Sequence, residues 1–212
     1  VYRSDDDGIT WVASHDGMNA EIATLALSAD GNTLFAGASA TIGDAGIYRS
    51  NDKGKTWNIV NNGLSDPDIR AFHIGNNKIF AGTSTGISRS DNKGDLWRTA
   101  SEGLPKLAVI SIGSIYHIVF AGTNNSFAFG TLDAGDRWSQ YKKGFTRPKV
   151  NAILGVGNSF FAGTDALPNQ GNGGLHLTTD YGTTWKQVKN GLPVMNINTL
   201  AGNSSNLSVL GD

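Results

Sequence analysis

The chain has 212 residues, and its 17 basic and 18 acidic side chains give a net charge of −1. This balance offers no basic patch for nucleic acid or an anionic membrane, and the absence of cysteine excludes disulfides, thiolate metal sites and cysteine nucleophiles. The chain has 28 glycines but only 5 prolines, which indicates many tight turns. No apolar run reaches the ~20 residues of a membrane helix. We therefore expect a folded, turn-rich chain that binds no nucleic acid and does not insert into a membrane.

The tryptophans recur at a nearly constant period of 46, 40, 41 and 47 residues. Each ends the octapeptide Ser/Thr-x-Asp-x-Gly-x-Thr-Trp, which is complete in three copies; the third copy has Asn92 and Leu96 and the fourth has Arg137 at variant positions. Such a period is typical of repeat architectures. The octapeptide residues are Ser4, Asp6, Gly8 and Trp11; Ser50, Asp52, Gly54 and Trp57; Ser90, Asn92, Gly94 and Trp97; Thr131, Asp133, Gly135 and Trp138; and Thr178, Asp180, Gly182 and Trp185.

A second motif, apolar-aromatic-Ala-Gly, runs in phase with the octapeptide. It begins at Leu34, Ile79, Val119 and Phe160, with a weaker copy at residues 209–211, and an alternating stretch precedes each copy. Alternation and the flanking turn residues predict β-strands. In the best-defined unit we expect strand A at 69–74, a turn at 75–77, strand B at 78–83, strand C at 86–90 and strand D at 96–100. In the unit before it, strand D is expected at 56–60.

Four strands in 40 to 47 residues match the size of a β-propeller blade. The chain begins with a C/D pair at residues 1–14 and ends with an A/B pair at about 196–211. We therefore expect one all-β domain over residues 1–212, a propeller of five four-stranded antiparallel blades whose terminal blade is assembled from both ends. The alternative is a piece of a six- or seven-bladed propeller.

The octapeptide has a structural logic. Its glycine allows a positive φ in the C-to-D turn, its Asp and Ser/Thr side chains can bond turn amides, and its Trp anchors the turn on the sheet. Carboxylates placed one per blade cannot converge on one site. We therefore interpret these residues as structural rather than catalytic or metal-binding.

At these octapeptides the sequence resembles the Asp-box, or bacterial neuraminidase repeat, propellers. This family includes sialidases, xyloglucan-active glycoside hydrolases, sortilin-type receptor domains, photosystem assembly factors and many secreted repeat proteins. The resemblance covers all five units and implies the fold rather than a chemistry. The Arg-Ile-Pro signature of sialidases is absent, and no arginine triad can be assigned, which argues against a sialidase.

A binding site is expected on the face formed by the B-to-C loops and D-to-A crossovers, away from the octapeptide turns. Two of these loops are long, at residues 38–46 and 165–174, and long loops on a rigid scaffold often carry function. The binding-face candidates are Asp44, Arg70, Lys106, Arg147, Lys149, Asn169, Gln170 and Asn172.

A glycoside hydrolase would need two carboxylates roughly 5 to 10 Å apart. Only Asp66 or Asp68, opposite Asp165, can be suggested as weak catalytic candidates. The four histidines lie at no metal-ligand spacing, so no metal or cofactor is expected.

The sequence favours a non-catalytic extracytoplasmic module, secreted, periplasmic or on the cell surface. It would bind a protein or a glycan, or act as a scaffold beside other domains of a larger chain. The alternatives are a xyloglucanase-like glycoside hydrolase, or a fragment of one, and an assembly factor in a multiprotein complex.

Overall fold

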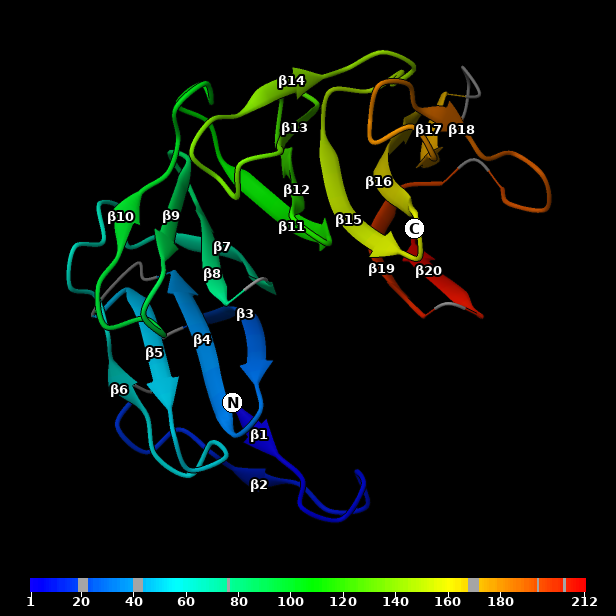
Figure 1. The fold of residues 1–212 in the computed structure, drawn as a ribbon. Coiled ribbons are helices and arrows are strands. Elements are labelled where there is room, and N and C mark those ends of the chain that lie inside the picture. Colours follow the sequence, from blue (N-terminus) through cyan, green and yellow to red (C-terminus); the bar gives the residue numbers. More distant parts are fainter. Residues whose placement is uncertain (19–22, 40–43, 76, 168–171, 194, 204) are drawn as a thin grey trace. The chain divides into compact units, whose positions relative to one another are not determined.

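The computed structural model describes residues 1–18, 23–39, 44–75, 77–167, 172–193, 195–203 and 205–212 (Figure 1). Over these residues the secondary structure consists of β-strands and turns, and none of them forms a helix long and apolar enough to cross a membrane. The chain divides into two compact units, residues 1–83 with 88–99, and residues 84–87 with 100–212. That residues 1–212 form one domain stays a prediction.

Four sheets in the described part are four-stranded antiparallel meanders, as expected for strands A to D. Their alternating, β-branched and aromatic segments suit a pleated, half-buried surface. The strands are β3 (Ala23–Asp30), β4 (Thr33–Ser39), β5 (Gly46–Ser50) and β6 (Asn58–Ile59); β7 (Ile69–Gly75), β8 (Lys78–Thr83), β9 (Ile87–Ser90) and β10 (Arg98–Thr99); β11 (Val109–Ile115), β12 (Ile118–Thr123), β13 (Ala128–Thr131) and β14 (Ser139–Tyr141); and β15 (Val150–Val156), β16 (Ser159–Leu167), β17 (Asn172–Thr178) and β18 (Lys186–Gln187).

Two further sheets have two strands each. β1 (Tyr2–Arg3) pairs with β2 (Val12–Ala13), and β19 (Ile197–Gly202) pairs with β20 (Leu207–Gly211). The expected C/D pair and A/B pair are therefore present, whereas their union into one blade stays a prediction.

The register of β20 corrects the predicted motif at residues 209–211. Ile197 pairs with Gly211 as Ile69 pairs with Thr83, so Gly211 takes the threonine position of the motif. Counting back along β20 from that pair puts Ser208 at the position of Phe80. The predicted motif at residues 209–211 is therefore one residue out of register, because Gly211 was the only residue that matched the motif closely and it was assigned to the glycine position.

The D strands are shorter than predicted, with two or three residues each. The reason is visible at Trp57, whose backbone N–H donates to Asp16 O at 2.8 Å instead of joining the sheet ladder. The predicted loop at 165–174 is also shorter, because β16 extends to Leu167 and β17 begins at Asn172, and these two residues pair.

Each A strand has a register shift near its start, which is the mark of a β-bulge. In three of them the extra residue is Arg70, Asn151 or Asn198. Because a bulge re-aims a side chain out of the regular alternation, these positions are suited to carry polar groups at a sheet end.

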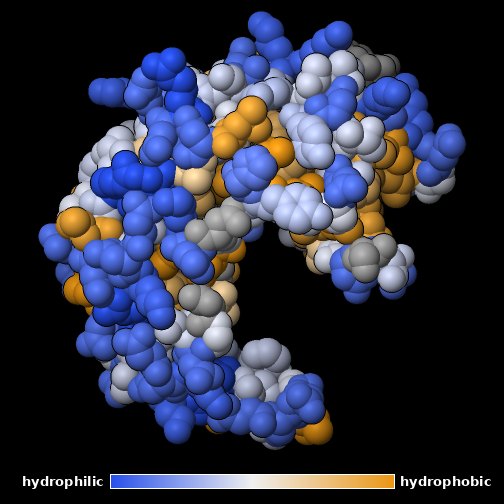
Figure 2. Space-filling view, viewed as in Figure 1, coloured by the Kyte–Doolittle hydropathy of each residue, from blue (hydrophilic) through white to orange (hydrophobic). Residues whose placement is uncertain are grey.

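The core lies between neighbouring sheets within each unit. In the first unit it contains Phe35, Ile47, Ile69, Ile79, Ala81 and Trp97, and in the second Phe120, Val150, Ile153, Phe160 and Trp185. The Ala-Gly step of strand B permits this stacking, because a Cβ on Gly37 would overlap Ile69 of the next sheet. In Figure 2 the surface over β5, β6 and β10 is mostly hydrophilic, with isolated hydrophobic spots.

Candidate binding site

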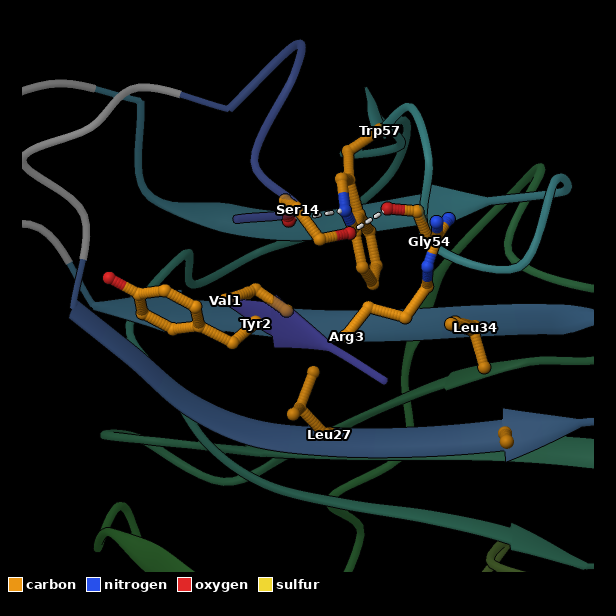
Figure 3. Close-up of a pocket in the computed structure, with 9 residues that line it drawn as sticks. Val1, Tyr2, Arg3, Ser14, Leu27, Leu34, Gly54 and Trp57 are labelled. Carbon is orange, nitrogen blue, oxygen red and sulfur yellow. Dashed lines mark hydrogen bonds between the residues drawn. The ribbon is translucent and has the colours of Figure 1, made fainter. Parts of the chain in front are cut away.

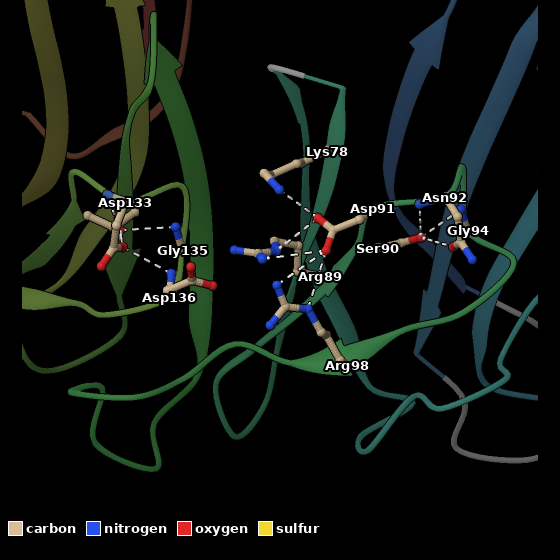
Figure 4. A network of polar contacts seen from close by, with 11 residues as sticks. Lys78, Arg89, Ser90, Asp91, Asn92, Gly94, Arg98, Asp133, Gly135 and Asp136 are labelled. Atoms are coloured by element: carbon tan, nitrogen blue, oxygen red, sulfur yellow. Dashed lines mark hydrogen bonds and ion pairs between the residues drawn. The ribbon is translucent and has the colours of Figure 1, made fainter.

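The octapeptide turns share one hydrogen-bond scheme. The first residue's Oγ accepts from the backbone N–H of the glycine at 2.8 to 3.0 Å in all five copies. The Asp or Asn Oδ1 accepts from the N–H before the tryptophan, as Asp52 does from Thr56 at 2.9 Å. Leu96 and Arg137 keep this backbone bond in the two variant copies, since it needs no particular side chain. Figure 4 shows the third copy, with Ser90, Asn92 and Gly94.

The turn also contains a left-handed residue that the sequence did not reveal. The residue before each glycine has a φ of 54 to 60°, and its identity varies among Asp7, Lys53, Lys93, Ala134 and Tyr181. A non-glycine residue there is uncommon and costs conformational energy. The side-chain bonds of the octapeptide hold it in place, and because the residue type varies, no sequence signal marks it.

Three of the tryptophans link their turn to the repeat before it, and Figure 3 shows this link for Trp57 and Ser14. Within the units, the indole N–H groups of Trp57, Trp97 and Trp138 donate to Ser14 O, Val60 O and Ala100 O at 3.1, 2.8 and 2.8 Å. These three side chains and Trp185 are 2% exposed, whereas Trp11 is 62% exposed and its indole bonds only within its own turn, to Gly8 O. The tryptophan is therefore an anchor between repeats as well as within the turn.

Hydrogen bonds hold the turn carboxylates ionised. Bonds led by the Thr10 hydroxyl lower the pKa of Asp6 to about 2, and bonds led by the Thr184 hydroxyl lower the pKa of Asp180 to about 2. The pKa of Asp52 is lowered mainly by the Thr56 N–H, and that of Asp133 mainly by the Thr131 hydroxyl. Asp133 and Asp180 are exposed, Asp6 and Asp52 are half-buried, and all four carboxylates stabilise their own turns.

We expect acid to destabilise these turns at a lower pH than that at which an ordinary aspartate becomes protonated. Because the folded pKa lies below the unfolded value of about 3.9, the stabilisation is complete above about pH 4 and is lost as the pH falls through about 2. The melting temperature of an Asp6→Asn/Asp180→Asn variant should therefore fall less between pH 4 and pH 2 than that of the wild type. Asp7→Asn, which changes the carboxylate next to Asp6 in the same turn, is the control, and equal falls in all three proteins would contradict the expectation.

A cationic group surrounds one carboxylate in the first unit. The Asp91 carboxylate forms ion pairs with Lys78 Nζ at 2.9 Å, Arg89 Nε at 3.1 Å and Arg98 at 3.2 Å (Figure 4). The Arg89 side chain is only 2% exposed. A buried guanidinium requires such a partner. We interpret this group as structural, because Asp91 satisfies the buried charge.

An amide-rich group of side chains gathers at the ends of β15, β16, β19 and β20 in the second unit. Asn151 Nδ2 donates to Asp165 Oδ1 at 2.8 Å, and Lys149 Nζ pairs with the same oxygen at 3.3 Å. The Nδ2 atoms of Asn196 and Asn198 donate to Asp212 Oδ1 at 3.2 and 2.9 Å, which lowers the Asp212 pKa. We call Lys149, Asn151, Asp165, Asn196, Asn198 and Asp212 the amide cluster.

The sequence prediction found only part of the amide cluster. Lys149 was a binding-face candidate and Asp165 a catalytic candidate, whereas the three asparagines and Asp212 were missed. Asn151 and Asn198 occupy equivalent bulge positions, and each donates to the carboxylate that follows its strand B partner. A search for a polar residue after the first apolar residue of strand A would have found both.

The other binding-face candidates are spread over the two units, so their predicted assembly into one rim stays a prediction. Asp44 and Arg70 belong to the first unit; Lys106 and Arg147 belong to the second. Asp44 contributes its carbonyl to the Tyr48 hydroxyl at 2.8 Å, and Lys106 is exposed. Asn169 and Gln170 lie outside the described residues, and Asn172 begins β17.

The catalytic candidates are engaged locally. Asp68 Oδ2 pairs with Arg70 at 2.6 Å, and Asp66 Oδ1 accepts from the Asp68 N–H at 3.0 Å in the first unit. Asp165 belongs to the second unit, where Lys149 and Asn151 contact it. Their pairing across a substrate stays a prediction. Over the described residues, no group of three or more His, Asp or Glu side chains could hold a metal ion.

The repeated four-stranded meanders define a protein with a β-propeller-like fold. No protein-family model matches the chain, and no curated protein matches it in sequence. Solved structures do match. An ancestral GH74 enzyme has a TM-score of 0.65 and 18% identity over 85% of this chain and 25% of its own.

Two further solved structures have the same kind of fold. The extracellular domain of BT4673 from B. thetaiotaomicron, named as a hybrid two component system, has a TM-score of 0.71 and 17% identity over 95% of this chain and 27% of its own. The GH74 xyloglucanase from Xanthomonas campestris has a TM-score of 0.62 and 17% identity over 94% of this chain and 36% of its own. The chain therefore spans about a quarter to a third of the length of these three proteins. At these identities the likeness shows the fold alone.

Proposed function

We propose that this chain is a non-catalytic β-propeller module of an extracytoplasmic protein and that it binds a glycan at the amide cluster. The observation that carries the proposal is that three asparagine amides, two carboxylates and one ammonium group gather at the ends of two neighbouring sheets, which the Asn151 and Asn196 side chains link by hydrogen bonds to Ile197 O and the Ala166 N–H. Amides both donate and accept, which suits the hydroxyl groups of a sugar. A protein ligand, also predicted from the sequence, usually requires an apolar centre to its interface, and the cluster side chains are polar.

The alternative function is glycoside hydrolysis, because two of the similar structures are GH74 proteins. Hydrolysis needs one carboxyl group that holds a proton and donates it to the leaving oxygen. Asp165 Oδ1 is instead held by the Lys149 ammonium group and the Asn151 amide. Asp68 Oδ2 is likewise held by Arg70. These contacts support binding over catalysis.

Calorimetry with xyloglucan and cello-oligosaccharides tests both functions on the purified chain. We expect binding without product, and we expect Asn151→Ala to weaken it at least about tenfold, since a buried polar contact is worth about 1 to 2 kcal/mol. Arg70→Ala, at the equivalent bulge of the first unit, is the matched control and should bind normally. Equal affinity of Asn151→Ala and the wild type would exclude the amide cluster as the glycan-binding site. Product formation abolished by Asp66→Asn, Asp68→Asn or Asp165→Asn would establish a hydrolase.

The extracytoplasmic location is supported by the likeness to the extracellular domain of BT4673. A scaffold or assembly role within a complex would instead give a stoichiometric partner on purification. The number of blades is five if β19 and β20 complete the sheet of β1 and β2, or six or seven if other repeats do. These alternatives differ in the strand that lies against β1.

A further inference from the structure

Arg147 differs from the other arginines of the described chain because it has no anionic partner there. Six of the seven arginines form an ion pair with a carboxylate: Arg3 with Asp5, Arg49 with Asp95, Arg70 with Asp68, Arg89 and Arg98 with Asp91, and Arg137 with Glu102. Among the residues that the structure describes, the buried Nε atom of Arg147 has no hydrogen-bond partner either. A partly buried guanidinium is normally paired, so this one is suited to an external anion.

The crossover that contains Arg147 is strongly basic. It joins β14 to β15 and reads Lys-Lys-Gly-Phe-Thr-Arg-Pro-Lys over residues 142–149, with four basic residues and no acidic one (Figure 1). Of these four, only Lys149 is paired within the described part of the chain, with Asp165 at 3.3 Å. The net charge of the whole chain is −1, so this excess of positive charge is local. It attracts an anion to the crossover.

Phe127 is bound to the same crossover through its backbone. Its N–H donates to Pro148 O at 2.6 Å, and its φ is +63°. The equivalent residue is Gly46 in the β3–β6 sheet and Gly174 in the β15–β18 sheet, since the residue that follows each pairs with the glycine of the Ala-Gly motif. A bulky residue with a positive φ is an outlier that costs conformational energy. Such outliers gather at functional sites.

The Phe127 ring is half-buried and packs on a second aromatic ring. Its centroid lies 6.3 Å from that of Phe145, and the two ring planes are tilted by 37°. Phe145 in turn packs against His176 and Trp185, at centroid distances of 5.0 and 4.7 Å. Packed aromatic side chains therefore hold the Phe127 ring in place. A partly exposed ring that is held in this way suits the apolar C–H face of a sugar.

A short stretch of backbone links Phe127 and Arg147 to the amide cluster. Pro148, whose carbonyl accepts the Phe127 hydrogen bond, stands between Arg147 and Lys149, and Lys149 belongs to the amide cluster. Two residues of extended chain span at most about 7 Å, so the Cα atoms of Arg147 and Lys149 lie within this distance. One short sugar chain is therefore long enough to contact the amide cluster, the guanidinium and the aromatic ring.

We infer that the glycan bound at the amide cluster is acidic, with a carboxylate that pairs with Arg147 and a sugar ring that stacks on Phe127. This inference rests on the proposed function, because the amide cluster binds the hydroxyl groups of the same sugar chain. The guanidinium fork of an arginine can donate to both oxygens of a carboxylate. A uronic-acid glycan carries one carboxylate on every sugar ring and meets this requirement.

Calorimetry of the full chain with a hexamer of galacturonate and with its methyl ester tests the carboxylate. The two oligosaccharides differ only in charge and in the ester methyl groups. We expect the acid to bind at least about tenfold more tightly than the ester, and we expect Arg147→Gln to remove this difference. Lys143→Gln, which removes an exposed charge from the same crossover, is the matched control. It should keep the difference at about 0.15 M salt, because exposed charges are then screened.

Phe127→Gly tests the stacked ring and separates it from a role in packing. Glycine, as in the two other sheets, adopts a positive φ without strain, so the variant should keep the melting temperature of the wild type. Both oligosaccharides should bind about three- to tenfold more weakly, since an aromatic contact is lost. A lower melting temperature with unchanged affinity would assign Phe127 to packing alone and overturn its part in the site.

The results distinguish a failure of this inference from a failure of the proposed function. Equal affinity of the wild type for acid and ester, with Asn151→Ala still weakening both, would overturn the acidic ligand and leave the glycan site in place. A preference for the acid that survives Arg147→Gln would also overturn the inference. A wild type that binds xyloglucan but neither galacturonate hexamer would do the same, whereas one that binds none of the three would overturn the proposed function as well.

Discussion

Gly103→Ala should destabilise the second unit by at least about 3 kcal/mol. Gly103 has a φ of +87°, where an L side chain is strained, and a Cβ there would overlap the carbonyl oxygen of Trp138. The same contact lets Trp138 N–H donate to Glu102 O at 2.8 Å. Chemical denaturation followed by tryptophan fluorescence measures the change.

Gly191→Ala is the matched control for this substitution. Gly191 occupies the equivalent crossover position with a φ of +78°, but among the described residues no atom lies within 4 Å of the place that a Cβ would take. In Gly191→Ala only the unfavourable positive φ of the alanine remains, so the expected loss in the free energy of unfolding is about 1 kcal/mol. If both variants lose equal stability, the contact with the next repeat's tryptophan contributes nothing and the backbone conformation alone matters.

The second large effect is expected between pH 7 and pH 4 and originates at His176. Its side chain is fully buried, Nδ1 contacts Gly174 O at 3.3 Å, and the ring packs against Phe145 at a centroid distance of 5.0 Å. Burial lowers its pKa to about 4. The unfolded imidazole titrates near pH 6.5 and the folded one near pH 4, so between these values only the unfolded state gains the proton. The free energy of unfolding therefore has its full value above about pH 6.5 and falls by about 3 kcal/mol as the pH falls to 4.

His176→Phe removes this dependence without opening a cavity, because Phe129 occupies the equivalent strand C position in another sheet. The free energy of unfolding of the variant should change by about 3 kcal/mol less than that of the wild type between pH 7 and pH 4. His117→Gln, at an exposed turn, is the control and should behave as the wild type. An unchanged pH profile in His176→Phe would contradict the assignment. His73, whose pKa burial also lowers to about 4, accounts for part of the remaining slope.

Much of the fold could be predicted because each repeat is determined by residues that lie close together in the sequence. The octapeptide and the Ala-Gly motif mark turns and strands whose determinants are a few residues apart. Strand order within each sheet and the roles of Ser50, Asp52 and Gly54 followed from that local chemistry.

What the sequence did not reveal depends on contacts between distant residues. The shortness of the D strands results from a hydrogen bond from Trp57 to Asp16, and the register of β20 results from its pairing with β19. The amide cluster forms because bulges at Asn151 and Asn198 turn both side chains toward carboxylates on the neighbouring strands. A polar residue after the first apolar residue of strand A can be seen in the sequence, but neither the bulge that redirects its side chain nor the carboxylate that it contacts can be.

The direction of the tryptophan hydrogen bonds has a consequence for biogenesis. Within the units, Trp57, Trp97 and Trp138 all donate to carbonyl groups that precede them by about 40 residues, and none of these bonds requires a residue made later. The acceptor of each of these three indoles has therefore been synthesised before the tryptophan itself leaves the ribosome. Within each unit the sheets can be added in chain order, with a new sheet packing on the one before it.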